Sequence, residues 1–195
     1  MRKIVAVISL TLDGVMQAPG RKAEDTRGGF AHGGWAGPYF DPVMMQTMGE
    51  GMSRSGAMLF GRRTYEDFHK VWPARTDSPF SKVLDEGQKY VASRTLREPL
   101  PWQNSTLLAG EAAESVARLK QEPGKDVVVL GSGELLRTLL KHDLVDSLVL
   151  SIHPLVLGSG RRLFDADDVR HGYRLVKSAP TTTGVVIATY EPVRA

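Results

Sequence analysis

The segment that most restricts the fold is the apolar run at residues 57–60, which passes through Gly61 into the polar stretch 62–66, Arg-Arg-Thr-Tyr-Glu. The apolar run predicts a buried strand, and the polar stretch predicts a helix beginning at Thr64. Thr64 with Asp67 three residues later matches a capping box, and the free N–H groups of a helix start attract an anion. Glycine permits close approach of a ligand, and arginine carries a fixed positive charge. The segment therefore predicts either a phosphate-binding turn or a surface turn with two solvated arginines.

Composition narrows the class of protein. A chain of 195 residues with 42% hydrophobic and 24% charged residues is typical of one globular domain, and we expect a single domain over residues 1–195. The net charge of +3 suits an anionic small ligand but indicates no nucleic-acid partner. The absence of cysteine excludes disulfides, thiolate metal sites and cysteine nucleophiles.

No segment predicts a membrane partner or a metal site. The apolar run at residues 4–10 is too short to be a signal-peptide core or a membrane span, so we expect a cytoplasmic protein. The five histidines, which show no metal-binding spacing, are His32, His69, His142, His153 and His171. His153 precedes Pro154 on a predicted strand and is interpreted as a buried structural histidine or as an acid.

Strand and helix signals alternate along the chain. Strands are expected at residues 4–10, 57–60, 88–92, 106–109, 127–130 and 148–157, and helices at 41–53, 64–69, 80–86, 111–121 and 134–142. Residues 174–177 and 185–191 are expected to form a closing hairpin. The alternation predicts an α/β fold with a mostly parallel central sheet, helices on both faces and a C-terminal antiparallel hairpin.

A glycine-rich stretch at residues 16–40 separates the first strand from the first helix. A loop of this length is usually functional, so we expect a lid or one wall of a substrate pocket. The basic residues of this loop and of a later one are interpreted as substrate ligands or as solvated charges; they are Arg21, Lys22, Arg27, Arg161 and Arg162.

A second glycine turn, Gly131-Ser132-Gly133, lies between the strand at 127–130 and the next helix. Its backbone amides could bind a pyrophosphate, or its glycines could tighten the strand-to-helix packing. It is not the dinucleotide fingerprint, because Leu136 stands where the third glycine belongs. Glu134 would compete with a phosphate for the helix start, unless it points aside to a ribose or a neighbouring loop.

In this order the segments resemble the dihydrofolate reductase superfamily, most of all the reductase domain of the bifunctional riboflavin-biosynthesis deaminase/reductase. The resemblance spans nearly the whole chain. It is carried by Ser9-Leu10-Thr11-Leu12-Asp13-Gly14, Gly61-Arg62-Arg63-Thr64-Tyr65-Glu66, Val91-Ala92-Ser93-Arg94-Thr95-Leu96, Gly131-Ser132-Gly133-Glu134-Leu135, and Pro154 to Gly160 followed by Leu163-Phe164. It implies a three-layer dihydrofolate-reductase-like fold and a homodimer.

The resemblance also implies hydride transfer from NADPH to a small heterocycle, or to a ribosylamino-pyrimidine as in 5-amino-6-(5-phosphoribosylamino)uracil reductase. Arg62 and Arg94 would hold the adenosine 2′-phosphate. Thr64 and the amides of residues 132–135 would hold the pyrophosphate. The residues so implied in cofactor binding are Ser9, Gly61, Arg62, Thr64, Ser93, Arg94, Gly131, Ser132, Gly133, Glu134 and Leu135.

Two carboxylates are candidate catalytic residues. Asp13 is interpreted as a polar substrate contact or as the first residue of an Asp-Gly turn. Asp41 is interpreted as a catalytic carboxylate or as the N-cap of the first helix. Counting back from Gly61 places Met45 where dihydrofolate reductases carry their acidic residue, which argues against folate reduction. The alternative is a catalytically silent NADPH-binding sensor or assembly protein.

Overall fold

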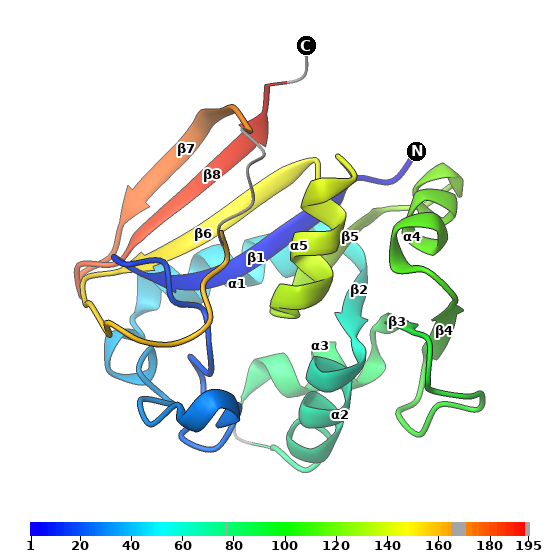
Figure 1. Cartoon of the computed structure of the whole chain (residues 1–195), viewed down its shortest axis with the longest axis horizontal. Coiled ribbons are helices and arrows are strands. Elements are labelled where there is room, and N and C mark those ends of the chain that lie inside the picture. The colour runs from blue at the N-terminus through cyan, green and yellow to red at the C-terminus, as the bar shows by residue number, and fades with distance from the viewer. Residues whose placement is uncertain (77, 165–170, 194–195) are drawn as a thin grey trace. The chain divides into compact units, whose positions relative to one another are not determined.

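The computed structural model describes residues 1–76, 78–164 and 171–193 (Figure 1). The strands are β1 (Ile4–Thr11), β2 (Ser55–Gly61), β3 (Gln88–Ser93), β4 (Ser105–Ala109), β5 (Asp126–Leu130), β6 (Ser147–His153), β7 (Tyr173–Pro180) and β8 (Val186–Pro192). The α-helices are α1 (Pro42–Arg54), α2 (Arg62–Val71), α3 (Pro79–Glu86), α4 (Ala112–Gln121) and α5 (Gly133–Lys141). Short 3-10 turns occur at Arg27–Gly29 and Gly37–Tyr39.

The described strands form one eight-stranded sheet in the order β4-β3-β2-β5-β1-β6-β8-β7. The pairs β4-β3, β3-β2 and β2-β5 are parallel, whereas β8 is antiparallel to both β6 and β7. The α/β class, the mostly parallel sheet and the C-terminal hairpin predicted from the sequence are confirmed. The strand expected at 148–157 ends earlier, at His153, because the next residue is a proline and has no N–H to donate.

The chain forms two compact units, one from residues 1–6 and 52–145 and the other from residues 7–51 and 146–195. None of the described helices has the length and apolar character needed to cross a membrane.

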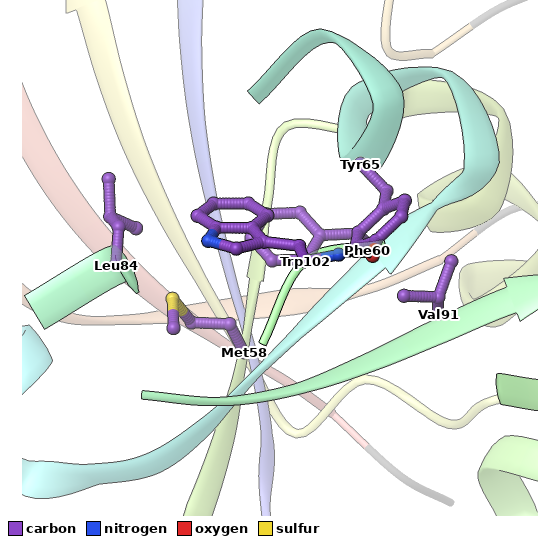
Figure 2. Packing of buried hydrophobic residues seen from close by; sticks show 6 residues of the cluster. All are labelled: Met58, Phe60, Tyr65, Leu84, Val91 and Trp102. Carbon is purple, nitrogen blue, oxygen red and sulfur yellow. Dashed lines mark hydrogen bonds between the residues drawn. The ribbon is translucent and has the colours of Figure 1, made fainter. Parts of the chain in front are cut away.

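The first unit has its core around β2 and β3, where Met58, Phe60, Tyr65, Leu84, Val91 and Trp102 pack together (Figure 2). Residues 57–60 are all buried, as expected of a strand in a parallel sheet that is covered on both faces. The Tyr65 hydroxyl accepts a hydrogen bond from the Trp102 amide at 2.9 Å. This bond ties the first turns of α2 to the loop between β3 and β4.

The second unit folds the glycine-rich stretch into a packed loop. Its apolar side chains surround one another in a small cluster of Val15, Ala18, Phe30, Trp35 and Ala36. Gln17 is buried, and its side-chain amide donates to the carbonyls of Asp25 and Arg27 at 3.1 and 2.9 Å. The Gln17 side-chain carbonyl accepts a hydrogen bond from the Arg161 amide at 3.0 Å. These contacts give the loop a defined conformation; its use as a lid or pocket wall stays a prediction.

Candidate functional site

Three turns of the first unit follow the carboxyl ends of three neighbouring parallel strands, β3, β2 and β5. In the strand register Gly61 lies beside Ala92, which places the Ser93-Arg94 turn next to the β2–α2 turn. Leu59 lies beside Val129, so Gly61 and Gly131 each come two residues after a matched pair. The parallel register therefore brings the predicted cofactor residues of this unit to one edge of the sheet.

Helix α2 begins at Arg62, and Gly61 is its N-cap in extended backbone with φ −80° and ψ 159°. The predicted capping box at Thr64 is therefore wrong, because Thr64 already lies in the first helical turn and no side chain caps this helix. The helix starts directly at the end of β2, which leaves no room for a separate cap. The Gly61 amide instead donates to the Ser132 hydroxyl at 2.8 Å.

The β5–α5 turn is unusual in its backbone. Gly131 and Ser132 both have left-handed conformations, with φ of 61° and 58°. For Ser132 this conformation costs roughly 1–2 kcal/mol, because its Cβ crowds the following carbonyl. A Cβ on Gly131 would lie 3.6 Å from Thr64 Cγ2, and one on Gly61 would lie 3.5 Å from Leu135 Cβ. The β2–α2 and β5–α5 turns are thus in contact, which joins five of the predicted cofactor residues. A Cβ would meet only ordinary van der Waals distances at both glycines, so tight packing does not account for them; at Gly131 the left-handed backbone favours glycine.

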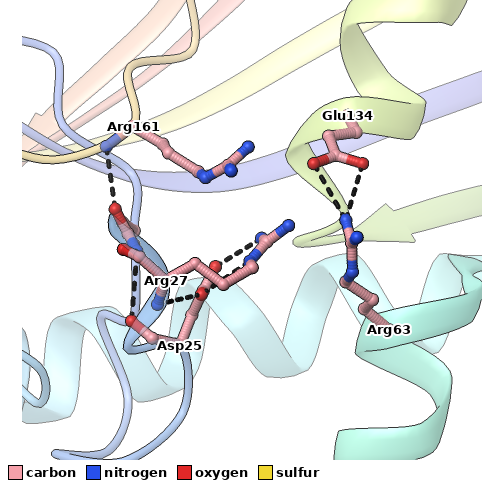
Figure 3. Close-up of polar contacts among 6 residues, drawn as sticks. Asp25, Arg27, Arg63, Glu134 and Arg161 are labelled. Carbon is pink, nitrogen blue, oxygen red and sulfur yellow. Dashed lines mark hydrogen bonds and ion pairs between the residues drawn. The ribbon is translucent and has the colours of Figure 1, made fainter. Parts of the chain in front are cut away.

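The arginines of these turns have different partners. Arg62 is exposed, and within the described chain its guanidinium has no hydrogen bond or ion pair. Arg63 Nη1 donates to both carboxylate oxygens of Glu134, at 3.0 and 2.9 Å (Figure 3). Of the alternatives for Glu134, the structure shows it turned toward the neighbouring β2–α2 turn. The sequence holds only one signal for the Arg63–Glu134 pair: a basic residue and an acidic residue follow two strands that turn out to be adjacent and parallel.

The Ser93-Arg94 turn is closed by its own serine. The Ser93 hydroxyl accepts hydrogen bonds from the amides of Thr95 and Leu96, both at 3.1 Å. Arg94 Nη1 lies 3.4 Å from a carboxylate oxygen of Glu111, and both side chains are exposed. Arg94 therefore lies with Arg62 at the carboxyl ends of the parallel strands. Its ion pair with Glu111 is exposed and weak, so a phosphate could replace Glu111 as its partner.

Asp13 lies in the second unit and is held by several donors. Its carboxylate accepts from the Thr11 hydroxyl at 2.5 Å and from the amides of Gly158 and Leu157 at 2.9 and 3.3 Å. The Thr11 hydrogen bond is the main cause that lowers the Asp13 pKa to about 2. The geometry supports the turn-forming interpretation, because this carboxylate is ionised at neutral pH and fastens two loops.

Asp41 is the N-cap of α1, as one of the two interpretations has it. One carboxylate oxygen accepts from the Met44 amide at 2.8 Å, and this hydrogen bond is the main cause that lowers the Asp41 pKa. The other oxygen accepts from the amide and the hydroxyl of Thr182, at 2.6 and 2.7 Å. The sequence analysis missed this second contact, which fastens the β7–β8 turn to the start of α1. Because both oxygens accept hydrogen bonds and the pKa is lowered, the Asp41 carboxyl group carries no proton to donate at neutral pH.

His153 is completely buried in the second unit. Its Nδ1 lies 2.9 Å from the Ser151 carbonyl and 3.2 Å from the Leu10 carbonyl. The rings of Trp35 and Tyr39 pack edge-on against it, with centroids 5.0 and 5.5 Å away. Burial lowers the pKa of this imidazole. These surroundings support the structural interpretation of His153 over an acid role.

Ser9 lies on β1, in the second unit, and its grouping with the cofactor residues of the first unit stays a prediction. Among the basic loop residues, Arg27 forms an ion pair with Asp25, with Nε donating to Oδ1 at 2.8 Å (Figure 3). Arg162 Nε donates to the Asp13 carbonyl at 2.8 Å. These two arginines therefore stabilise loops, whatever else they contact.

A model of the RibD C-terminal domain family matches residues 2–187 of the chain. The uncharacterized protein YyaP of Bacillus subtilis (strain 168) is 29% identical over 194 residues, which cover 97% of this chain and 94% of that protein. Together these matches extend over nearly the whole described chain.

Solved structures show the same fold. A putative riboflavin biosynthesis protein from Shewanella sp. PV-4 has a TM-score of 0.71 and 23% identity, over 98% of this chain and 99% of that one. The dihydrofolate reductase of Enterococcus faecalis, solved with NADP(H), has a TM-score of 0.62 and 13% identity, over 97% and 96%. The predicted dihydrofolate-reductase-like fold is confirmed.

Proposed function

The chain belongs to the RibD C-terminal domain family, and we propose on that premise that it is an NADPH-dependent reductase. In this proposal it transfers a hydride to a small heterocycle or a ribosylamino-pyrimidine, as 5-amino-6-(5-phosphoribosylamino)uracil reductase does. The family supports an oxidoreductase, and the choice of NADPH rests on the site described above. A homodimer is proposed from the same family membership.

The observation that carries the cofactor proposal is the set of three turns at the ends of β3, β2 and β5. They combine two interlocked glycine turns, two helix starts without a side-chain cap, and arginines at the same edge. Uncapped N–H groups and fixed positive charge are what the phosphates of a dinucleotide require. The E. faecalis enzyme, which shares the fold, was solved with NADP(H), and this adds support.

Within this proposal the residues of the chain bind and orient the cofactor. Arg62 and Arg94 pair with the 2′-phosphate, a charge-assisted contact that NADH cannot make. The amides at the start of α5 face the pyrophosphate. The nicotinamide supplies the hydride when it is bound. Asp13 and Asp41 receive no proton-transfer role, because their carboxylates are ionised and engaged by other donors.

The proposal is tested by titrating the protein with NADPH and with NADH while following nicotinamide fluorescence. We expect NADPH to bind more tightly, and Arg62→Ala to weaken NADPH about tenfold or more with little change for NADH, because one charge-assisted contact is lost. Arg118→Ala removes an exposed charge from α4 and is the matched control. Absence of NADPH binding, or a preference for NADPH that Arg62→Ala leaves undiminished, would contradict the proposal.

A second candidate is a catalytically silent NADPH-binding sensor or assembly protein. It is favoured by the two candidate catalytic carboxylates, whose oxygens hold turns and loops together. NADPH consumption with any member of a panel of pterins, aminopyrimidines and quinones would contradict it. Folate reduction is the least supported candidate, since Met45 stands where an acid is needed.

A further inference from the structure

Two neighbouring arginines at the start of α2 differ sharply in their surroundings. Arg62 has no partner among the described residues, whereas Arg63 is held by Glu134 through two short contacts of 3.0 and 2.9 Å. Figure 3 shows the Arg63 guanidinium reaching across to the first turn of α5, where Glu134 lies. The pair joins the two turns that are also joined by the Gly61–Ser132 hydrogen bond.

The position of Glu134 has an electrostatic consequence. A carboxylate in the first turn of α5 is stabilised by the free N–H groups and the dipole of that helix, as a bound anion would be. It also neutralises Arg63, which stands next to the arginine proposed to contact cofactor. Any phosphate that approaches this turn therefore meets a negative charge and an arginine already engaged.

We propose that Glu134 competes with the cofactor's pyrophosphate for Arg63 and the start of α5. The pyrophosphate binds at this turn by displacing Glu134 from Arg63. This inference rests on the proposed function, since it concerns how the same site binds a dinucleotide. Both NADPH and NADH carry a pyrophosphate, so Glu134 sets the affinity for both alike. Arg62 sets the preference between them. The ion pair is about half exposed on both sides, 54% and 55%, so it can open without unfolding the turn.

The test compares dissociation constants of NADPH and NADH for the wild type, Glu134→Gln, Arg63→Gln and the double variant. Glu134→Gln keeps the shape of the side chain and removes its charge. We expect it to tighten both cofactors about twofold to fivefold, the scale of an exposed ion pair, with a steeper weakening by added salt. The gain should be smaller in the Arg63→Gln background. Glu114→Gln, on the exposed face of α4, is the control for net charge.

The outcomes separate the inference from the proposed function. If the wild type binds NADPH but Glu134→Gln binds it equally or more weakly, with an unchanged melting temperature, the inference is overturned and the proposed function stands. A gain confined to NADPH would also overturn it. If the wild type binds neither cofactor, the proposed function fails. In that case NADPH binding by Glu134→Gln alone would support the competitor role, and none by either protein would overturn it.

Discussion

At the scale of single residues, Ser132 combines a conformational cost with a contact that offsets it. Its left-handed backbone is unfavourable for any residue with a Cβ, and its hydroxyl accepts from the Gly61 amide at 2.8 Å. Strained residues of this kind are often found at ligand-binding turns. Here the strain positions the hydroxyl that links the β2–α2 and β5–α5 turns.

We expect Ser132→Ala to lower the free energy of unfolding by about 1–2 kcal/mol, because it keeps the strain and leaves the Gly61 amide without its acceptor. Ser132→Gly loses the same hydrogen bond but relieves the left-handed cost, so it should be the milder change. Urea unfolding followed by circular dichroism measures both. A larger loss for Ser132→Gly than for Ser132→Ala would contradict this account of the turn.

At the scale of elements, the C-terminal end of helix α3 is capped by a lysine side chain from the following strand, β3. Lys89 on β3 is completely buried, and its Nζ donates to the carbonyls of Leu84, Asp85 and Gly87 at 2.9, 2.8 and 2.7 Å. A positive charge at a helix C-terminus is favourable because the last carbonyls have no partner within the helix. The Nζ also lies 4.5 Å from the centroid of the Trp102 ring, a cation–π contact.

We expect Lys89→Met to lower the free energy of unfolding by about 2–4 kcal/mol, because it leaves buried carbonyls unpaired. Lys82→Met, an exposed change on the same helix, should have an effect within about 0.5 kcal/mol. Urea unfolding at neutral pH measures both variants. Equal effects of the two substitutions would show that the buried contacts of Lys89 add nothing.

Lys89 also has a pH signature. Burial lowers its pKa from 10.5 to about 8 in the folded protein. The unfolded state therefore binds more protons between pH 8 and 10.5, and stability conferred at this site rises with pH across that range. The stability difference between the wild type and Lys89→Met should grow over the same window.

At the scale of the whole molecule, acid should reduce stability in two steps. Burial lowers the pKa of His153 below 6.5, so the imidazole takes up a proton more readily in the unfolded state than in the folded state. The free energy of unfolding therefore falls as the pH drops below about 6.5. Asp13 and Asp41 have lowered pKa values in the folded protein, so the stability that their carboxylates confer is fully present above pH 3.8. It is lost as the pH falls below 3.8, and for Asp13 the loss continues to about pH 2.

The first step is tested with His153→Asn, whose side-chain amide can keep the hydrogen bond to the Ser151 carbonyl. We expect this variant to be less stable at pH 7 and to show a flatter dependence of the unfolding free energy between pH 6.5 and 5. Unfolding in urea at several pH values measures the slope. A slope unchanged from the wild type would assign the acid loss to other groups.

The sequence predicted well wherever the signal was local. The buried strands β2 and β5, the glycine turn after β5 and the Asp41 cap of α1 each depend on residues within a few positions of one another. The start of α2 was misplaced by two residues, because Thr64 matches a capping pattern although Gly61 already ends the strand and begins the helix. Boundaries depend on where a strand stops, which its sheet partners decide.

The sequence by itself determined the order of elements, the fold class and the family resemblance, because periodicity and turn residues are read over short distances. Only the tertiary structure decided which charges meet. Arg63 contacts Glu134 across 71 positions and Asp41 contacts Thr182 across 141. Such pairs are set by the register and order of strands, and no local pattern encodes them. For that reason the sequence could propose the cofactor residues and place Glu134 at the start of α5, whereas only the structure shows that Glu134 pairs with Arg63.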